Sequence, residues 1–512
     1  MSFDTLSFLF FFLPAVMVAY FATEVVGRLS LFRVSSNQDV AQATWVNPLL
    51  PLQNVILLIA SLFFYAWGEP IYVLLLIGSS VVAWSGGCLM AWLRSKNRHA
   101  AERMVMIVTI VLLVSSLGVF KYLDFFVTNI NQIPSFNLPL AHLALPIGIS
   151  FYTFQILSYI IDLHRGVVSV QRNPFRLLLY VSLFPQLIAG PIVRYQTVEK
   201  ELTQRCFSSK DVQEGTFRFI RGLAKKILLA DNVSRFSIAV YGVYSQSLSD
   251  ATVPDTVGTI ALWLAALAYT LQIYFDFSGY SDMAIGLGRI FGFHFLENFN
   301  LPYISRSVTE FWRRWHMSLS GWFRDYVYIP LGGNRCSKAR WTFNLLVVWM
   351  LTGFWHGAGW NFILWGLFYG ILLIVEKNIP WLKAGKEAEI PLLSIRSVGG
   401  WLYTFFIVNI GWVLFNIEDP DRLSSVMYRM FVWHPTSWHR MLAENSEIIL
   451  SSVWLPVAFL LSFPVLRCVR RVVTCGEVMQ TVIRMIVSMA LLLLCLVYIV
   501  SSSFHPFIYF RF

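Results

Sequence analysis

Long apolar runs, separated by short polar segments, recur along the whole chain. A helix needs about 20 mainly apolar residues to cross the hydrocarbon core of a bilayer, and the runs predict about twelve such spans. The expected spans lie at residues 5–22, 52–67, 70–93, 104–126, 143–163, 227–245, 257–275, 341–357, 359–376, 400–418, 447–465 and 485–503. Because a helix satisfies its own backbone in lipid, the pattern predicts an all-α polytopic membrane protein.

Three segments depart from this simple pattern. Prolines and a glycine interrupt residues 177–192, and charged residues flank the apolar stretch 279–295. Irregular backbone is tolerated at membrane depth where protein or water satisfies it, so we expect re-entrant elements at both places. Residues 217–227 carry basic residues on one helical face, which is typical of an interfacial helix. No linker is long enough to set off a soluble domain, which favours a single membrane domain over residues 1–512.

The composition agrees with a membrane protein and excludes a soluble one. Hydrophobic residues make up 57% of the chain and charged residues 13%, against about 25% charged in soluble domains. The net charge of +11 comes largely from basic residues in alternate short loops: residues 94–103 are rich in Lys and Arg, whereas 129–142 have none. The positive-inside rule explains this better than nucleic-acid binding. It predicts that residues 94–103 and 306–340 face the cytoplasm and that 129–142, 246–256 and the C-terminus face outward. The apolar spans also predict that membrane lipids surround the protein.

One segment, residues 274–340, combines acids, arginines, aromatics and glycines more densely than any other. Asp276 and Asp282 lie beside apolar spans, where an ionisable residue is expensive and indicates function by default. They are therefore candidate substrate-binding residues. The alternative is that both cap or anchor short helices.

Arginines in the same segment predict a cationic vestibule on the cytoplasmic side, suited to a phosphate-bearing donor. The members of this group are Arg306, Arg313, Arg314, Arg324 and Arg335. The alternative is a solvated helix face, because Glu310 stands three and four residues before Arg313 and Arg314 and predicts local ion pairs.

Two of the nine histidines stand apart from the others. His316 ends the arginine-rich helix, and His356 is the one histidine that the predicted spans bury. A buried imidazole must find a partner, so a structural histidine is one interpretation. The other is a neutral imidazole that acts as a general base near neutral pH. The six cysteines show no metal-ligand spacing and no pairing pattern, so we expect neither a metal site nor a disulfide framework.

The ordered blocks FDFSGYSDMAIGLGRIFGF, ENFNLPYISRSVTEFWRRWHMSLSGWFRDYVYIPLGGNR and GFWHGAGWNFILWG closely resemble the membrane-bound O-acyltransferase family. The upstream LPIGISFYTFQILSYIIDLHRG and FPQLIAGPIVRY look like the branch that contains the alginate O-acetyltransferases. The resemblance covers roughly residues 50–380, a core in which residues 274–370 hold the catalytic segment. Long blocks in the expected order are far more specific than a single short motif.

The resemblance implies a core with a tunnel and an activity that moves an acyl group from a thioester to a hydroxyl. It implies that His356 of the WHG motif and His316 of the RRWH motif are catalytic, with Asp325 helping His316 to orient a substrate. The implied donor is acetyl-CoA, as a substrate and not a bound cofactor. The implied acceptor is an exported polysaccharide, alginate or a related exopolysaccharide, reached through periplasmic acetyltransferase proteins at the bacterial inner membrane.

Two other functions share part of this pattern. A membrane transporter for a lipid-linked sugar would have the same spans, broken helices and buried charges. A scaffold subunit of a polysaccharide export complex would also be a polytopic membrane protein. Neither function requires the two histidine motifs.

Overall fold

The computed structural model describes residues 2–34, 47–205, 208–242, 256–379, 394–444, 446–465 and 476–501. Within these ranges the regular structure is entirely helical. The chain folds into two compact units: unit 1 holds residues 1–223 and 280–296, and unit 2 holds 224–279 and 297–512. Helix α11 (Thr259–Ile290) is continuous through the boundary at 279/280. The single membrane domain expected from the sequence stays a prediction.

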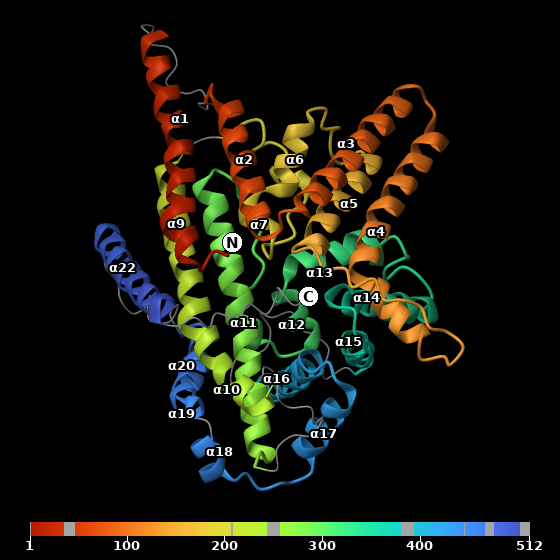
Figure 1. Cartoon of the computed structure of the whole chain (residues 1–512), viewed down its shortest axis with the longest axis vertical. Helices are drawn as coiled ribbons and strands as arrows, with labels where there is room; N and C mark the ends of the chain where they lie inside the picture. The colour runs from red at the N-terminus through yellow and green to blue at the C-terminus, as the bar shows by residue number, and fades with distance from the viewer. Residues whose placement is uncertain are drawn as a thin grey trace. The chain divides into compact units, whose positions relative to one another are not determined.

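Unit 1 is built from the N-terminal helices, α9 up to Leu223 and the last part of α11 (Figure 1). Its other helices are α1 (Leu13–Val34), α2 (Leu50–Gly68), α3 (Val73–Ser95), α4 (His99–Ile130), α5 (Ile149–Arg165), α6 (Pro174–Ser182), α7 (Phe184–Leu187) and α8 (Tyr195–Val198). Helix α9 runs over Ser209–Ala224, and the π-helix η1 (Phe8–Phe12) precedes α1.

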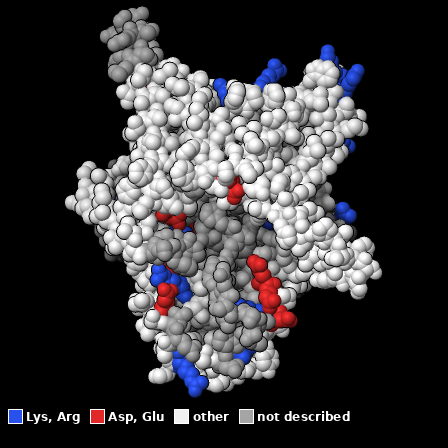
Figure 2. Space-filling view, in the orientation of Figure 1, with Lys and Arg blue, Asp and Glu red and all other residues white. Residues whose placement is uncertain are grey.

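Helices α3 and α4 form a hairpin whose short turn carries the basic residues of 94–103 (Figure 1). Lys and Arg side chains gather at this tip in Figure 2. The basic turn and the uncharged segment after Ile130 lie at opposite ends of α4, a 32-residue apolar helix. This arrangement agrees with the alternation of basic loops on which the predicted orientation rests.

Unit 2 contains the remaining helices (Figure 1). They are η2 (Lys225–Ala230), α10 (Asp231–Tyr241), η3 (Pro302–Ile304), α12 (Val308–Arg314), α13 (Met317–Phe323), η4 (Arg324–Tyr328), α14 (Lys338–His356), α15 (Trp360–Asn378), α16 (Ile395–Asn416), α17 (Pro420–Phe431), α18 (Trp438–Glu444), α19 (Glu447–Ser452), α20 (Trp454–Leu461) and α22 (Glu477–Ser501). Both η2 and η4 are π-helices, which occur frequently at functional sites.

In the described part of the chain, eight helices are long and apolar enough to cross a membrane. They are α2, α3, α4, α11, α15, α16, residues 8–27 and residues 478–501. The polytopic all-α fold is therefore confirmed. The four other expected spans form shorter, more polar or interrupted helices: α5 has 17 residues, α10 has 11, α14 carries several polar residues, and 447–465 splits into α19 and α20.

The two predicted interruptions had different outcomes. The break in 177–192 is confirmed, because α6 ends at Ser182 and α7 has only four residues. The break expected within 279–295 is wrong: α11 continues to Ile290. Gly286 allows α9 to approach closely, since a Cβ there would lie 2.6 Å from the Gly215 carbonyl oxygen. Gly286 is thus a helix-packing residue within a continuous helix.

The helix expected over 217–227 exists as the end of α9 followed by η2. Some of its basic side chains are buried or paired within the protein and do not face the membrane surface. Arg218 donates from Nε to Asp282 Oδ1 at 2.9 Å and is largely buried. Lys226, at the start of η2, is buried in unit 2.

Residues 243–255, which include most of the outward segment expected at 246–256, lie outside the described residues, as does the C-terminal Phe512. The orientation expected for these two segments stays a prediction.

Candidate active site

His316 occupies the turn between α12 and α13 in unit 2. Its side chain is buried, with 1% of its surface exposed. The backbone is in the left-handed region, with φ of +43° and ψ of +54°, which a non-glycine residue adopts only when its surroundings enforce it. The chain therefore turns sharply here, and the turn fixes where the imidazole lies.

Asn298 holds this turn from a position 18 residues earlier in the chain. Its backbone carbonyl accepts from the Met317 N–H at 3.0 Å, and its side-chain Oδ1 accepts from the Ser318 N–H at 3.2 Å. The same Oδ1 lies 3.1 Å from His316 Nδ1. A backbone N–H can only donate, so the atom facing Ser318 must be the amide oxygen, and His316 Nδ1 must donate to it. When the ring is neutral, Nε2 therefore carries the lone pair.

Aromatic rings surround His316. The Phe277 ring packs edge-on at 4.7 Å between centroids, and the Trp355 indole lies at 6.1 Å. Burial lowers the pKa of His316, so the neutral imidazole predominates near pH 7. A neutral buried imidazole with a fixed tautomer can accept a proton or a hydrogen bond at Nε2.

His356 is the last residue of α14 and is also buried, with 4% of its surface exposed. Trp365 of α15 and Phe415 of α16 pack against the imidazole, each with ring centroids 5.2 Å away. Gly357 follows at once, and a Cβ there would lie 2.1 Å from a carbon of the Phe362 ring. Gly357 is therefore required for packing against α15.

Trp355 connects the two histidines. Its indole lies 4.9 Å from the His356 ring and 6.1 Å from the His316 ring, between centroids. The structure thus brings His316 and His356, 40 residues apart in the sequence, next to one aromatic side chain. The burial expected for His356 is confirmed. The expectation that His356 would be the one buried histidine is wrong, because His316 is at least as buried.

Asp276, on α11, belongs to a buried ionic cluster in unit 2. Lys226 Nζ lies 3.1 Å from Asp276 Oδ1 and 2.6 Å from Asp231 Oδ1, and each of the three side chains is buried. One lysine between two carboxylates compensates much of the cost of burying these charges. The neighbouring residue, Phe277, is the one that packs against His316. The cluster therefore anchors the part of α11 that contacts His316.

Asp282, two helical turns later, belongs to unit 1. It accepts from Arg218, and Arg221 lies 3.7 Å away. The sequence grouped Asp276 and Asp282 as substrate-binding candidates. The structure gives each of them a cationic partner in a different unit, and their role in binding substrate stays a prediction.

Comparison with known proteins agrees with the two histidine motifs. The model of the membrane-bound O-acyltransferase family matches residues 147–382, which include both histidines and the whole polar segment. The chain is 41% identical to the probable alginate O-acetylase AlgI of Pseudomonas aeruginosa over 395 residues, 76% of this chain and 72% of that protein. The chain belongs to the membrane-bound O-acyltransferase family. It is accordingly an O-acyltransferase and a multi-pass membrane protein.

Other relatives of this O-acyltransferase are named for other acceptors. The peptidoglycan O-acetyltransferase of Helicobacter pylori is 35% identical over 474 residues, which cover 87% of this chain and 83% of the relative. The teichoic acid D-alanyltransferase of Bacillus subtilis is 29% identical over 289 residues, 53% of this chain and 68% of the relative. The similarity to the O-acetyltransferases therefore extends over more of the chain.

The arginines of this O-acyltransferase occupy different environments. Arg314 donates to Glu310 Oε1 at 2.9 Å and to the Asn300 carbonyl at 3.2 Å, as the spacing with Glu310 predicted. Arg324 binds the Asp325 carboxylate through two hydrogen bonds of 2.6 and 3.0 Å. Arg313 and Arg335 are exposed, and Arg306 is half-buried beside α16. Asp325 is thus held by Arg324, and a link to His316 stays a prediction.

Three residues of the candidate site were not found from the sequence. Asn298 orients His316, Trp355 contacts both histidines, and Lys226 pairs with Asp276. The Lys226 and Asp231 pair has a recognisable signal, because both charges fall within or beside an otherwise apolar run. Asn298 has no comparable signal, since its function depends on a turn formed far along the chain.

Proposed function

We propose that this O-acyltransferase transfers an acetyl group from cytoplasmic acetyl-CoA toward hydroxyl groups of an exported polysaccharide, such as alginate or a related exopolysaccharide, at the bacterial inner membrane. An extracytoplasmic protein partner receives the acetyl group first and passes it to the glycan. The names of the relatives support this acceptor class, because alginate and peptidoglycan are both polysaccharides.

The observation that carries the chemistry is the pair of buried histidines that both contact Trp355. A hydroxyl is a poor nucleophile at neutral pH, and a positioned base contributes about 10²–10⁴-fold to its reaction. We assign the base to His356. The hydroxyl oxygen of the acceptor attacks the thioester carbonyl carbon of acetyl-CoA, and the hydroxyl proton passes to the His356 imidazole. The carbon–sulfur bond then breaks, and the coenzyme A thiolate takes up the proton.

His316 has a positioning role in this proposal. With Nδ1 donating to Asn298, its Nε2 can accept a hydrogen bond from a substrate group. Exposed Arg313 and Arg335 of the same unit supply positive charge for the phosphates of the donor. Arg314 and Arg324 already have carboxylate partners and contribute less to donor affinity.

Reconstitution tests the proposal. The purified chain is placed in liposomes with acetyl-CoA that is labelled on the acetyl group, a soluble exopolysaccharide and an extracytoplasmic acetyltransferase encoded beside the polysaccharide synthase. We expect label on the glycan when all components are present, and none when palmitoyl-CoA is the labelled donor.

Two results would contradict the proposal. Full-rate acetylation of the glycan by the chain without its partner would refute the relay. Labelled lipid or labelled teichoic acid, with unlabelled polysaccharide, would refute the acceptor class.

A further inference from the structure

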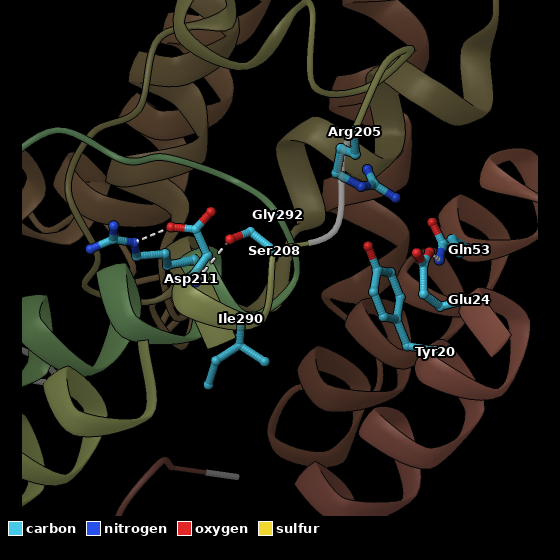
Figure 3. Close-up of a pocket in the computed structure, with 9 residues that line it drawn as sticks. Tyr20, Glu24, Gln53, Arg205, Ser208, Asp211, Ile290 and Gly292 are labelled. Atoms are coloured by element: carbon cyan, nitrogen blue, oxygen red, sulfur yellow. Dashed lines mark hydrogen bonds and ion pairs between the residues drawn. The ribbon is translucent and has the colours of Figure 1, made fainter. Parts of the chain in front are cut away.

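A pocket lies in unit 1, at some distance in the sequence from both histidines. Tyr20 and Glu24 of α1 and Gln53 of α2 form one side (Figure 3). Asp211 of α9 and the end of α11 form the other. All the lining residues belong to unit 1, whereas the histidine site belongs to unit 2. The O-acyltransfer chemistry proposed above does not use this pocket.

Arg205 reaches into the pocket from the segment before α9, and its guanidinium points toward the side formed by Tyr20 and Gln53 (Figure 3). Only 3% of the residue is exposed. Nη1 donates to the Glu201 carbonyl at 3.3 Å, and the guanidinium stacks on the Phe293 ring at 4.5 Å. Within the described ranges, Nε and Nη2 make no hydrogen bond of normal geometry, and the Tyr20 hydroxyl lies near the guanidinium.

A buried guanidinium without an anionic partner is unfavourable, because desolvation removes its hydration and the hydrogen bond to the Glu201 carbonyl replaces only part of it. Nε and Nη2 are the two donors on one edge of the guanidinium plane. This edge binds two oxygen atoms of one phosphate or carboxylate in parallel. The pocket therefore presents the geometry of a bidentate anion site.

The backbone keeps Arg205 in this position. Gly292, just after α11, has φ of +79°, a conformation that side chains rarely adopt. A Cβ at Gly292 would lie 3.2 Å from Arg205 Cδ and would crowd the arginine. The close approach of Gly292 thus leaves room for the buried side chain beside Phe293.

Charges of both signs line the pocket. Arg205 and Arg289 are positive, and Glu24 and Asp211 are negative. Arg289 donates from Nε to Asp211 Oδ1 at 2.7 Å, and Glu24 Oε2 accepts from Gln53 at 3.2 Å. A multiply charged soluble phosphate would meet two carboxylates here, whereas a headgroup with one phosphate and one ammonium matches both signs.

The outer surface of α1 favours a ligand from the membrane. Val18 and Val25 flank the turns that carry Tyr20 and Glu24, and both valines are exposed, as expected of a lipid-facing surface. We propose that the pocket binds the headgroup phosphate of a zwitterionic phospholipid of the phosphatidylethanolamine class, with Arg205 Nε and Nη2 as bidentate donors and with Glu24 and Asp211 near the ammonium group.

Lipid titration of the full-length protein tests this site. Protein washed free of lipid in detergent is titrated with dihexanoyl phosphatidylethanolamine, and bound lipid is counted by native mass spectrometry. Three other probes are tested in the same way. Inorganic phosphate and coenzyme A test for soluble phosphate ligands, and dihexanoylglycerol tests for recognition of the acyl chains alone. We expect the phospholipid to bind, and the three other probes neither to bind nor to displace it at equal concentration.

Two variants act on the pocket in different ways. Arg205→Met removes the guanidinium and should weaken lipid binding by at least about tenfold, as expected for hydrogen bonds to a charged group. Ser208→Trp fills the pocket and leaves Arg205 in place, so it keeps the test valid if Arg205→Met does not fold. Arg98→Met, an exposed arginine at the α3–α4 turn, is the matched control and should bind like the wild type.

Unchanged phospholipid binding in both pocket variants would overturn the site. Displacement of the lipid by coenzyme A or inorganic phosphate would overturn the lipid as its ligand. Equal binding of dihexanoylglycerol would show that acyl chains and not the phosphate are recognised, and would also overturn the proposal.

Discussion

The surroundings of His316 and His356 differ in kind, although both rings are buried in unit 2 and touch the same indole. Polar contacts fix His316: Asn298 clamps its turn and determines its tautomer. Aromatic rings from α15 and α16 enclose His356. A hydrogen bond fixes which nitrogen carries the proton, and the packed rings of α15 and α16 fix the plane of the His356 imidazole. Our proposal gives the two histidines different tasks, orientation at His316 and proton transfer at His356.

The largest effect should follow from removing the imidazole of His356. We expect His356→Ala to lose acetyl transfer by at least about 100-fold, the lower end of what a general base contributes. The acidic limb of the pH–rate profile should disappear, and the residual rate should be flat there. The measurement is the transfer rate per inserted protein in the reconstituted system.

His356→Gln, which keeps the size of the side chain, controls for collapse of the aromatic cage. His439→Ala, an exposed histidine on α18, should transfer acetyl at the wild-type rate. Near-normal activity in a well-folded His356→Ala protein would remove His356 as the base. If the acidic limb of the pH–rate profile persists in that variant, a group other than His356 is responsible for it.

A smaller effect is expected when the polar clamp on His316 is altered. Asn298→Ala should reduce the rate roughly tenfold, because a buried hydrogen bond that orients the ring is lost. Asn298→Asp should raise the pKa of His316, since a carboxylate favours the imidazolium form. Activity at low pH should then fall further than in the wild type, which the pH–rate profile measures. A profile unchanged by Asn298→Asp would mean that His316 serves packing alone.

Replacing the arginines next to the His316 turn should have two kinds of small effect, one on the KM for the donor and one on stability. Arg313 is exposed, so Arg313→Ala should raise the KM for acetyl-CoA a few-fold, with a larger increase at low salt. Arg314 pairs with Glu310, so Arg314→Ala should instead lower the free energy of unfolding by about 1–3 kcal/mol. Steady-state kinetics measures the change in KM, and thermal unfolding measures the change in stability. Equal donor KM in the wild type and in Arg313→Ala at low salt would exclude this arginine from donor binding.

The smallest effect concerns an exposed histidine in unit 1. The hydrogen bond with Glu201 raises the pKa of His294. The stabilisation is therefore present below about pH 6.5 and is lost as the pH rises through the raised pKa. His294→Gln should lower stability at pH 5.5 by less than about 1 kcal/mol, because the pair is solvent-exposed, and should change it less at pH 8.5. A larger loss at pH 8.5 would reverse the sign that we expect.

The sequence was sufficient for the fold class and singled out His316 and His356 as candidates, but it was insufficient for what surrounds them. Apolar runs of helix length predict spans such as α2, α3 and α4 directly, because lipid imposes that pattern. Neither the Asn298 clamp nor the contact of Trp355 with both histidines can be inferred from spacing. These contacts join residues on separate elements, and no local pattern specifies them.

The wrongly predicted break in α11 has a related cause. The charged residues that flank the apolar stretch 279–295 suggested an interrupted element. Arg218 neutralises Asp282, and Gly215 faces Gly286, so the same residues support a continuous helix once α9 is beside it. The sequence shows a charge, and only the fold shows its partner.

Because α11 is continuous, the thickness of the bilayer should affect which of its residues lie in the hydrocarbon. Its 32 residues extend about 48 Å at 1.5 Å per residue, whereas the hydrocarbon core is about 30 Å thick. Tilting alone would have to reach about 50°, beyond the range of about 0–40° found for membrane helices. One end of α11 must therefore stand outside the hydrocarbon, and its polar end with Asp282 and Arg289 suits the headgroup region. A thinner membrane would push this mismatch toward Phe277 and His316, which it contacts.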